Sequence, residues 1–375
     1  MRNLVLSIVL LATPALADLP ADCRTTPTRD CLLAEAQVII TTLPADQRAV
    51  LLWLDLAFAQ WSDGQDPTAA LAAAKTTASQ LTDPEDIAMA TQRTMSTLAR
   101  IRQFDAAFDL LATLPVDQGT TRDVANSQQY ISSELARAGM WADAQSLALS
   151  IANPDARNGA LERLAAERVA TDDIAAAQKI ISLMDYPDPL FTDRAAATIA
   201  AGQARLGDVP AALATVAAIA TPGPQVEGRI AVALALFDTG QSAASDLMFA
   251  DVTAQLTSLP TGVEQNRAAL TLTRALLKTG ALEQAQAVYG QYPVQSADTF
   301  QSDLLQATAR AGHTADAMAL LATFGDAADR PWPTLNAVQG FAEGGDTDGA
   351  LTLALALPQP SARAAALLDI AGALP

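Results

Sequence analysis

The sequence predicts an all-α protein, an α-solenoid of about nine helical hairpins with a capping helix at each end. Half of the 375 residues are hydrophobic but only 5% are aromatic, so the apolar content is mainly Ala and Leu, which favour closely packed helices. A sheet would need more Val, Ile, Tyr and Thr. One pattern also returns about every 35 residues: an apolar helix, a short turn, a second apolar helix and a proline. This period is typical of helical-hairpin repeats.

The turns inside the hairpins set the period. Each turn holds a Gly or another turn-forming residue, and successive turns are 32 to 40 residues apart. They fall at Gly64, Arg102, Gly139, Asp172, Gly207, Gly240, Gly280, Gly312 and Gly345. We therefore expect nine hairpins between residues 45 and 360.

A small residue stands five positions after each turn. A side chain larger than a methyl group would push apart two helices that cross near their turn, so this position is expected to pack at the crossing. It is occupied by Ala69, Ala107, Ala144, Ala177, Ala212, Ser245, Ala285, Ala317 and Ala350.

Prolines mark the passage from one hairpin to the next, because proline cannot continue a helix. They follow the expected second helices at Pro84, Pro115, Pro154, Pro187, Pro222, Pro260, Pro293, Pro331 and Pro358. Outside the hairpins, residues 31–42 and 361–373 are each predicted to form a lone helix that caps one end of the stack, since inner units bury their apolar faces only against neighbours. The expected division is a signal peptide at 1–17, an N-terminal segment at 18–44, repeats at 45–360 and a closing helix at 361–375.

The hairpin around the first turn carries further repeat features. Trp53, Leu56, Ala57, Gly64 and Ala69 have the order and spacing of an early Trp, a Leu, a small residue, a turn Gly and a packing Ala, while Phe104 and Trp141 each stand just after a later turn, two positions beyond the turn residue. In these residues the chain resembles the tetratricopeptide repeat family. The resemblance covers residues 45 to 360. It implies a concave face lined by the first helix of each hairpin and a role in binding proteins or peptides.

The N-terminus has the pattern of a secretory signal peptide. Arg2 precedes an apolar stretch from Leu4 to Leu11, and small residues stand at Ala15 and Ala17. We expect cleavage after Ala17 and a periplasmic location. The apolar stretch is too short to span a membrane, and the rest of the sequence suggests no membrane insertion.

Cys23 and Cys31 are the two cysteines of the chain. In an exported protein, this spacing favours a disulfide that pins the entry segment to the first helix, worth about 2–3 kcal/mol for so short a loop. A redox pair or half a metal site is the alternative. Redox pairs are usually C-x-x-C, and no further Cys or nearby His completes a metal site.

The charge of the chain restricts its partners. The net charge of −18 repels nucleic acid and anionic lipid headgroups, so we expect no nucleic acid partner.

Residues that could carry catalysis or bind a cofactor are scarce. The one histidine, His313, follows a turn glycine directly, and the phosphate-loop, nucleophile-elbow and zinc-protease motifs are missing from the sequence. Residues 345–349 resemble the start of a calcium loop, but Leu357 stands where the bidentate Glu is required. The acid pairs Asp172–Asp173 and Glu85–Asp86 could serve glycoside hydrolysis, but they fall at expected helix N-termini, which favour acids. We predict no enzyme activity, no cofactor and no metal.

One set of basic residues is a candidate binding site. Two positions before the turn, at the end of the first helix, stand Arg100, Arg137, Arg205, Lys278 and Arg310. By the resemblance, this position faces the groove, so the five could form a ladder for an acidic peptide or a terminal carboxylate. The alternative is that each cation stabilises the end of its helix by about 0.3–1 kcal/mol. The chain lacks, at the matching positions, the Asn and Lys set of the carboxylate clamps in this family.

Two functions remain open at this point. The first is a non-enzymatic periplasmic scaffold or adaptor that binds a protein or peptide partner on the concave face of the solenoid. The alternative is a helical accessory subunit of an envelope enzyme or transporter, similar to the helical part of a cell-wall lyase or a solute-transport partner.

Overall fold

A computed structural model describes residues 21–114, 121–184, 189–293, 295–327 and 329–374. The predicted signal peptide, Pro115 and Pro187 lie outside these residues. All regular structure in the described ranges is helical, which confirms the all-α solenoid. None of the described helices is long and apolar enough to cross a membrane.

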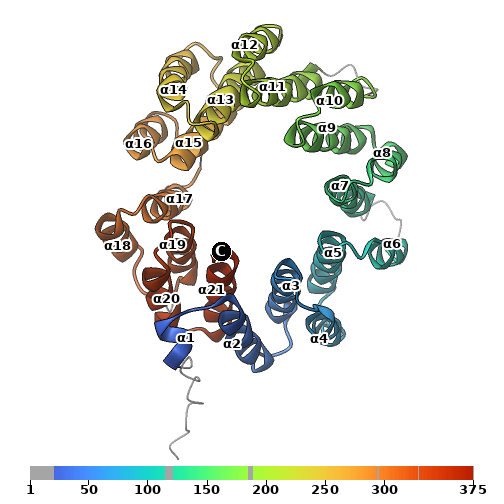
Figure 1. The fold of residues 1–375 in the computed structure, drawn as a ribbon, viewed down its shortest axis with the longest axis vertical. Helices are drawn as coiled ribbons and strands as arrows, with labels where there is room; N and C mark the ends of the chain where they lie inside the picture. The colour runs from blue at the N-terminus through green and yellow to red at the C-terminus, as the bar shows by residue number, and fades with distance from the viewer. Residues whose placement is uncertain (1–20, 115–120, 185–188, 294, 328, 375) are drawn as a thin grey trace, which may run out of the picture.

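The helices form a ring of two layers (Figure 1). The inner layer consists of α3 (Gln47–Ser62), α5 (Pro84–Arg100), α7 (Thr121–Arg137), α9 (Pro154–Ala170), α11 (Pro189–Arg205), α13 (Pro222–Asp238), α15 (Val263–Thr279), α17 (Ala297–Arg310), α19 (Pro331–Glu343) and α21 (Pro360–Ala373). The outer layer consists of α2 (Arg29–Thr41), α4 (Thr68–Ala78), α6 (Phe104–Ala112), α8 (Trp141–Ser150), α10 (Ile174–Ile181), α12 (Val209–Ala217), α14 (Ser242–Leu256), α16 (Leu282–Gln291), α18 (Thr314–Ala322) and α20 (Thr347–Ala356). A short helix, α1 (Ala21–Thr25), precedes them.

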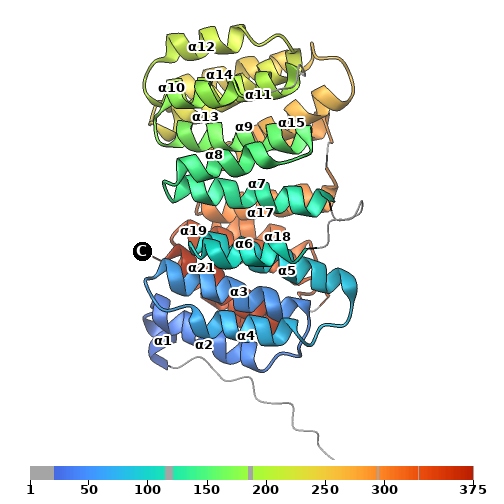
Figure 2. The same ribbon diagram turned by 90° about the vertical axis from the view of Figure 1, so that its right-hand side faces the viewer.

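The turns that join each inner helix to the following outer helix have left-handed backbone geometry. Seven are made by glycine with φ between +75° and +86°, a conformation that costs glycine nothing sterically. Arg102 and Asp172, both at φ 63°, occupy the other two. Seen from the side, the helices lie across the thickness of the ring (Figure 2). Because consecutive helices run in opposite directions, these nine turns lie together on one face, which we call the turn face.

Prolines begin several inner helices on the opposite face. Pro84, Pro154, Pro222 and Pro331 stand at the start of α5, α9, α13 and α19, where the missing N–H of proline costs no intrahelical hydrogen bond. These four of the predicted prolines thus coincide with the passage from an outer helix to the next inner one.

The predicted packing position is buried in eight of the nine hairpins. Ala107, Ala144, Ala177, Ala212, Ser245, Ala285, Ala317 and Ala350 are all fully buried, with 0% exposure. The prediction for Ala69 is wrong: its side chain is exposed, and Ala70 is buried instead. The cause is the first turn, since α4 begins four residues after Gly64, whereas α8 begins two residues after Gly139.

The two lone helices predicted at the chain ends exist, but they do not cover two separate ends. Helix α21 packs against α2 and α3, and the core cluster that contains Leu32 and Ile40 of α2 also contains Leu367 and Ile370 of α21. Helix α21 therefore acts as an inner helix whose outer partner is α2. The pair forms a tenth hairpin from the two ends of the chain and closes the ring (Figure 1).

Polar contacts reinforce this closure. The Arg29 guanidinium, in the first turn of α2, donates to the carbonyl oxygen of Ala371 at 3.0 Å and to that of Leu374. It also pairs with Asp63 at 3.0 Å. A cation thus binds the free carbonyls at the C-terminal end of α21, the end of the helix dipole that favours positive charge.

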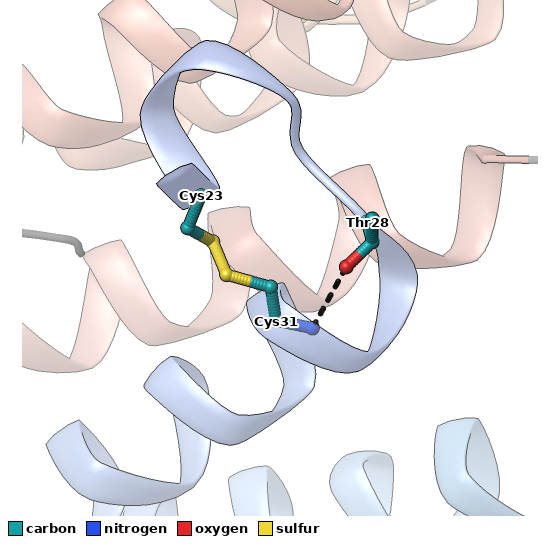
Figure 3. The surroundings of a disulfide bond; sticks show 3 residues. All are labelled: Cys23, Thr28 and Cys31. Carbon is teal, nitrogen blue, oxygen red and sulfur yellow. Dashed lines mark hydrogen bonds between the residues drawn. A yellow bond between two sulfur atoms is a disulfide. The ribbon is translucent and has the colours of Figure 1, made fainter. Parts of the chain in front are cut away.

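Cys23 and Cys31 form the predicted disulfide, with 5.9 Å between their Cα atoms (Figure 3). The bond ties α1 to the first turn of α2, where the Thr28 hydroxyl accepts a hydrogen bond from the Cys31 N–H at 3.3 Å. Cys23 is buried in the core cluster that crosses the ring closure.

Candidate functional site

The charges of the chain are divided between the two layers. The ten inner helices carry sixteen of the 23 basic residues and sixteen of the 41 acidic residues. They have no net charge, so the net charge of −18 comes from the outer helices, the turns and the termini. The outer helices hold only three basic residues, Arg29, Lys75 and Lys179. The inner layer of helices, whose surface toward the centre of the ring we call the inner wall, is thus neutral overall, and the acidic excess lies in the rest of the chain.

Ion pairs join neighbouring inner helices. Arg93 of α5 pairs with Asp55 of α3 at 3.4 Å, and Arg194 of α11 pairs with Glu162 of α9 at 3.1 Å. Arg267 of α15 pairs with Glu227 of α13 at 3.0 Å.

Burial raises the pKa of the two glutamates in these pairs, Glu162 and Glu227, while the neighbouring arginines oppose the shift. The inner wall therefore holds charges that are fixed across the joints between hairpins.

Four of the five ladder residues also form ion pairs with acidic side chains. Lys278 pairs with Asp238 at 3.0 Å, and Arg137 pairs with Glu134 and Glu167, each at 2.7 Å.

Arg205 and Arg310 make a second type of contact as well. Arg205 pairs with Asp172 at 2.7 Å and also donates to the carbonyl of Val169, near the end of α9. Arg310 pairs with Glu343 at 3.3 Å and donates to the carbonyl of Leu277, near the end of α15, at 2.9 Å. These cations thus stabilise the C-terminal end of the preceding inner helix rather than that of their own helix.

Arg100 differs from the other four. Its guanidinium carbon lies 3.3 Å from the centroid of the Phe58 ring, and none of the described acidic side chains is within 4.0 Å of it. The adjacent Arg102 lies over Trp61, with its guanidinium carbon 5.9 Å from the ring centroid, and it too has no acidic partner among the described residues.

A pocket of about 280 Å³ on the turn face is lined by Arg100, Arg102 and the two rings beneath them, Phe58 and Trp61, together with Arg137 and Glu134. The sequence prediction missed Arg102, Phe58 and Trp61. The sequence did contain a signal for this site, because Arg102 stands at a turn position that is glycine in most of the hairpins.

A second pocket, of about 400 Å³, lies at the ring closure between α3 and α21. Asp55 and Asp369 line it, with Arg29 and Arg100. Asp369 has no cationic partner among the described residues. The side chain of Asp369 is exposed to solvent, but it lies among the inner helices, and partial desolvation there raises its pKa to about 6, with repulsion from Asp55 and Glu343 adding to the shift.

The raised pKa of Asp369 predicts a pH-dependent stability. An acid with a higher pKa in the folded state destabilises that state when it is ionised, so this cost is fully present above about pH 6 and is lost as the pH falls towards the pKa of about 4 in the unfolded chain. We expect Asp369→Asn to raise the Tm at pH 7.5 and to have little effect near pH 4. Thermal melts between pH 4 and 8 measure the difference, and a gain that is equal at all pH values would contradict the explanation.

The other candidate groups have structural roles. Asp173 accepts a hydrogen bond from the Ala176 N–H at 3.0 Å, and Asp346 accepts one from the Gly349 N–H at 2.9 Å, so both cap helices. Glu85 and Asp86 stand in the first turn of α5 behind its capping residue, Asp83. In the described ranges, no group of three or more His, Cys, Asp or Glu residues could hold a metal ion.

Comparisons with known proteins add no family. No family model and no curated protein matches the chain. A crystal structure of Ton1535 from Thermococcus onnurineus NA1 aligns over 91% of this chain and 94% of that chain, with 14% identity and a TM-score of 0.27. At this TM-score the similarity says nothing about fold or function.

Proposed function

We propose that this chain is an exported, ring-shaped scaffold of tetratricopeptide-like hairpins that binds a protein or peptide partner on its inner wall and catalyses no reaction. The division of charge supports this proposal. Acidic residues outnumber basic residues in the chain as a whole, yet the inner helices carry equal numbers of the two. Fixed charges of both signs along a continuous wall suit the recognition of a polar polypeptide, because electrostatic complementarity determines specificity and orientation.

The disulfide and the N-terminal sequence support a periplasmic site of action. Disulfides persist in oxidising compartments, and the one between Cys23 and Cys31 joins the described N-terminal segment to the ring. An acidic exterior with few cations also reduces unspecific attachment to nucleic acid and anionic lipid.

Site-specific photo-crosslinking in the native envelope tests the use of the inner wall. A photoreactive residue at Gln306, which lines a pocket between α15 and α17, should yield a discrete protein adduct. The matched control is Gln178, an exposed residue on the outer helix α10, which should yield none. Adducts of equal intensity from both positions, or none from a series of inner positions, would argue against binding inside the ring.

A further inference from the structure

Arg100 and Arg102 stand out among the cations of the turn face because neither forms an ion pair with a described acidic residue, although Arg100 is close enough to Asp55 to oppose the raised pKa of that carboxyl. Arg137, Arg205, Lys278 and Arg310 each contact at least one carboxylate at 3.3 Å or less. No described acidic residue forms an ion pair with Arg100 or Arg102. Arg100 and Arg102 are thus two neighbouring guanidinium groups without an ion pair in a chain that has far more acidic than basic residues.

Both guanidinium groups lie over aromatic rings of the preceding hairpin. The distances to the ring centroids are 3.3 Å from Arg100 to Phe58 and 5.9 Å from Arg102 to Trp61. Contact with the face of a ring leaves the N–H groups in the guanidinium plane available to an acceptor. The rings therefore hold the two groups in place while their donors can reach the pocket of about 280 Å³ that both residues line.

Arg102 occupies a backbone conformation that disfavours its side chain. Its φ is 63°, in a turn position that is glycine in seven of the nine hairpins. The other exception, Asp172, is a residue type that tolerates this conformation, and its carboxylate pairs with Arg205. Arg102 makes no comparable bond with a described residue. Strained residues of this kind occur preferentially at binding sites, where the side chain serves a ligand.

We propose that Arg100 and Arg102 form an anion-binding site that takes a side-chain carboxylate from an acidic segment of the protein partner. This inference rests on the proposed scaffold function and names the chemistry of the partner. A carboxylate is planar and accepts two parallel N–H bonds from a guanidinium group. The acidic exterior does not prevent this approach, because exposed charges more than about 8–10 Å away are largely screened at physiological salt.

The test uses the mature protein and two probes, an N-acetylated hexaglutamate amide and the corresponding hexaglutamine peptide, with binding measured by calorimetry. We expect binding of hexaglutamate only. Arg100→Gln and Arg102→Gly should each weaken it by roughly five- to tenfold, since each removes a charge-assisted hydrogen-bond donor. Arg205→Gln, which removes a ladder residue that is already paired, is the matched control and should change the affinity by less than about twofold.

Arg102→Gly also separates binding from folding. Glycine is the residue that the other turns use at this φ, so the variant should melt at the same temperature as the parent or higher while it binds hexaglutamate more weakly. A purely structural role for Arg102 predicts a lower Tm and unchanged affinity.

Three results would overturn the proposal: unchanged affinity in Arg102→Gly, an equal loss in Arg205→Gln, or displacement of hexaglutamate by inorganic phosphate at lower concentration than by acetate. If hexaglutamate does not bind but the Gln306 adduct persists, the carboxylate site is wrong while the scaffold function stands.

Discussion

Leu367→Ala is expected to lower the free energy of unfolding by about 2–5 kcal/mol and to open the ring. Leu367 lies on α21 with 0% exposure, in the core cluster that also contains Leu32 of α2. The substitution removes apolar contacts and leaves a cavity at the one hairpin whose two helices are not consecutive in the chain. Separating these helices requires no other hairpin to unfold, so the closure should fail first.

Chemical denaturation measures the stability loss, and small-angle X-ray scattering detects opening as a larger radius of gyration. Leu272→Ala is the matched control, because Leu272 is equally buried at 0% exposure but belongs to the core cluster around α13 to α17. It should cost a similar free energy without enlarging the native protein. If both variants keep the parent's radius of gyration under native conditions, the closure is stronger than the packing argument implies.

Ala285→Leu is expected to destabilise the protein by about 1–3 kcal/mol through overpacking at the crossing of α15 and α16. Ala285 is fully buried in this core, with 0% exposure, so three additional carbon atoms must displace helix backbone. Ala212→Leu, at the equivalent position of α12, should have an effect of the same size.

The first hairpin supplies the control for this prediction. Ala69→Leu should change the stability by less than about 0.5 kcal/mol, as is usual for exposed positions, because Ala69 faces solvent. Ala70→Leu should reproduce the loss, since Ala70 is 2% exposed. Denaturant midpoints of the four variants compare the positions directly, and equal losses at Ala69 and Ala70 would contradict the shifted register of this hairpin.

The sequence by itself determined the hairpins. Their signals are local: a left-handed turn that favours glycine, a buried small residue at the helix crossing, and a proline that cannot continue a helix. Such signals depend on contacts within one unit, so they predicted the nine turns and eight of the nine packing residues. The exception at Ala69 arises where the chain inserts residues between Gly64 and the start of α4, which a fixed spacing does not detect.

Only the tertiary structure decided that the stack closes into a ring and which charges remain unpaired. Closure depends on the small rotation between successive hairpins, summed over the whole stack, so no single unit encodes it. For the same reason the two lone helices at 31–42 and 361–373 looked like independent caps, although they complete one hairpin. The ladder cations find their partners on neighbouring inner helices, about one repeat away in sequence. The geometry between hairpins therefore decides that Arg205 and Arg310 bridge adjacent inner helices while Arg100 and Arg102 form no ion pair with a described residue.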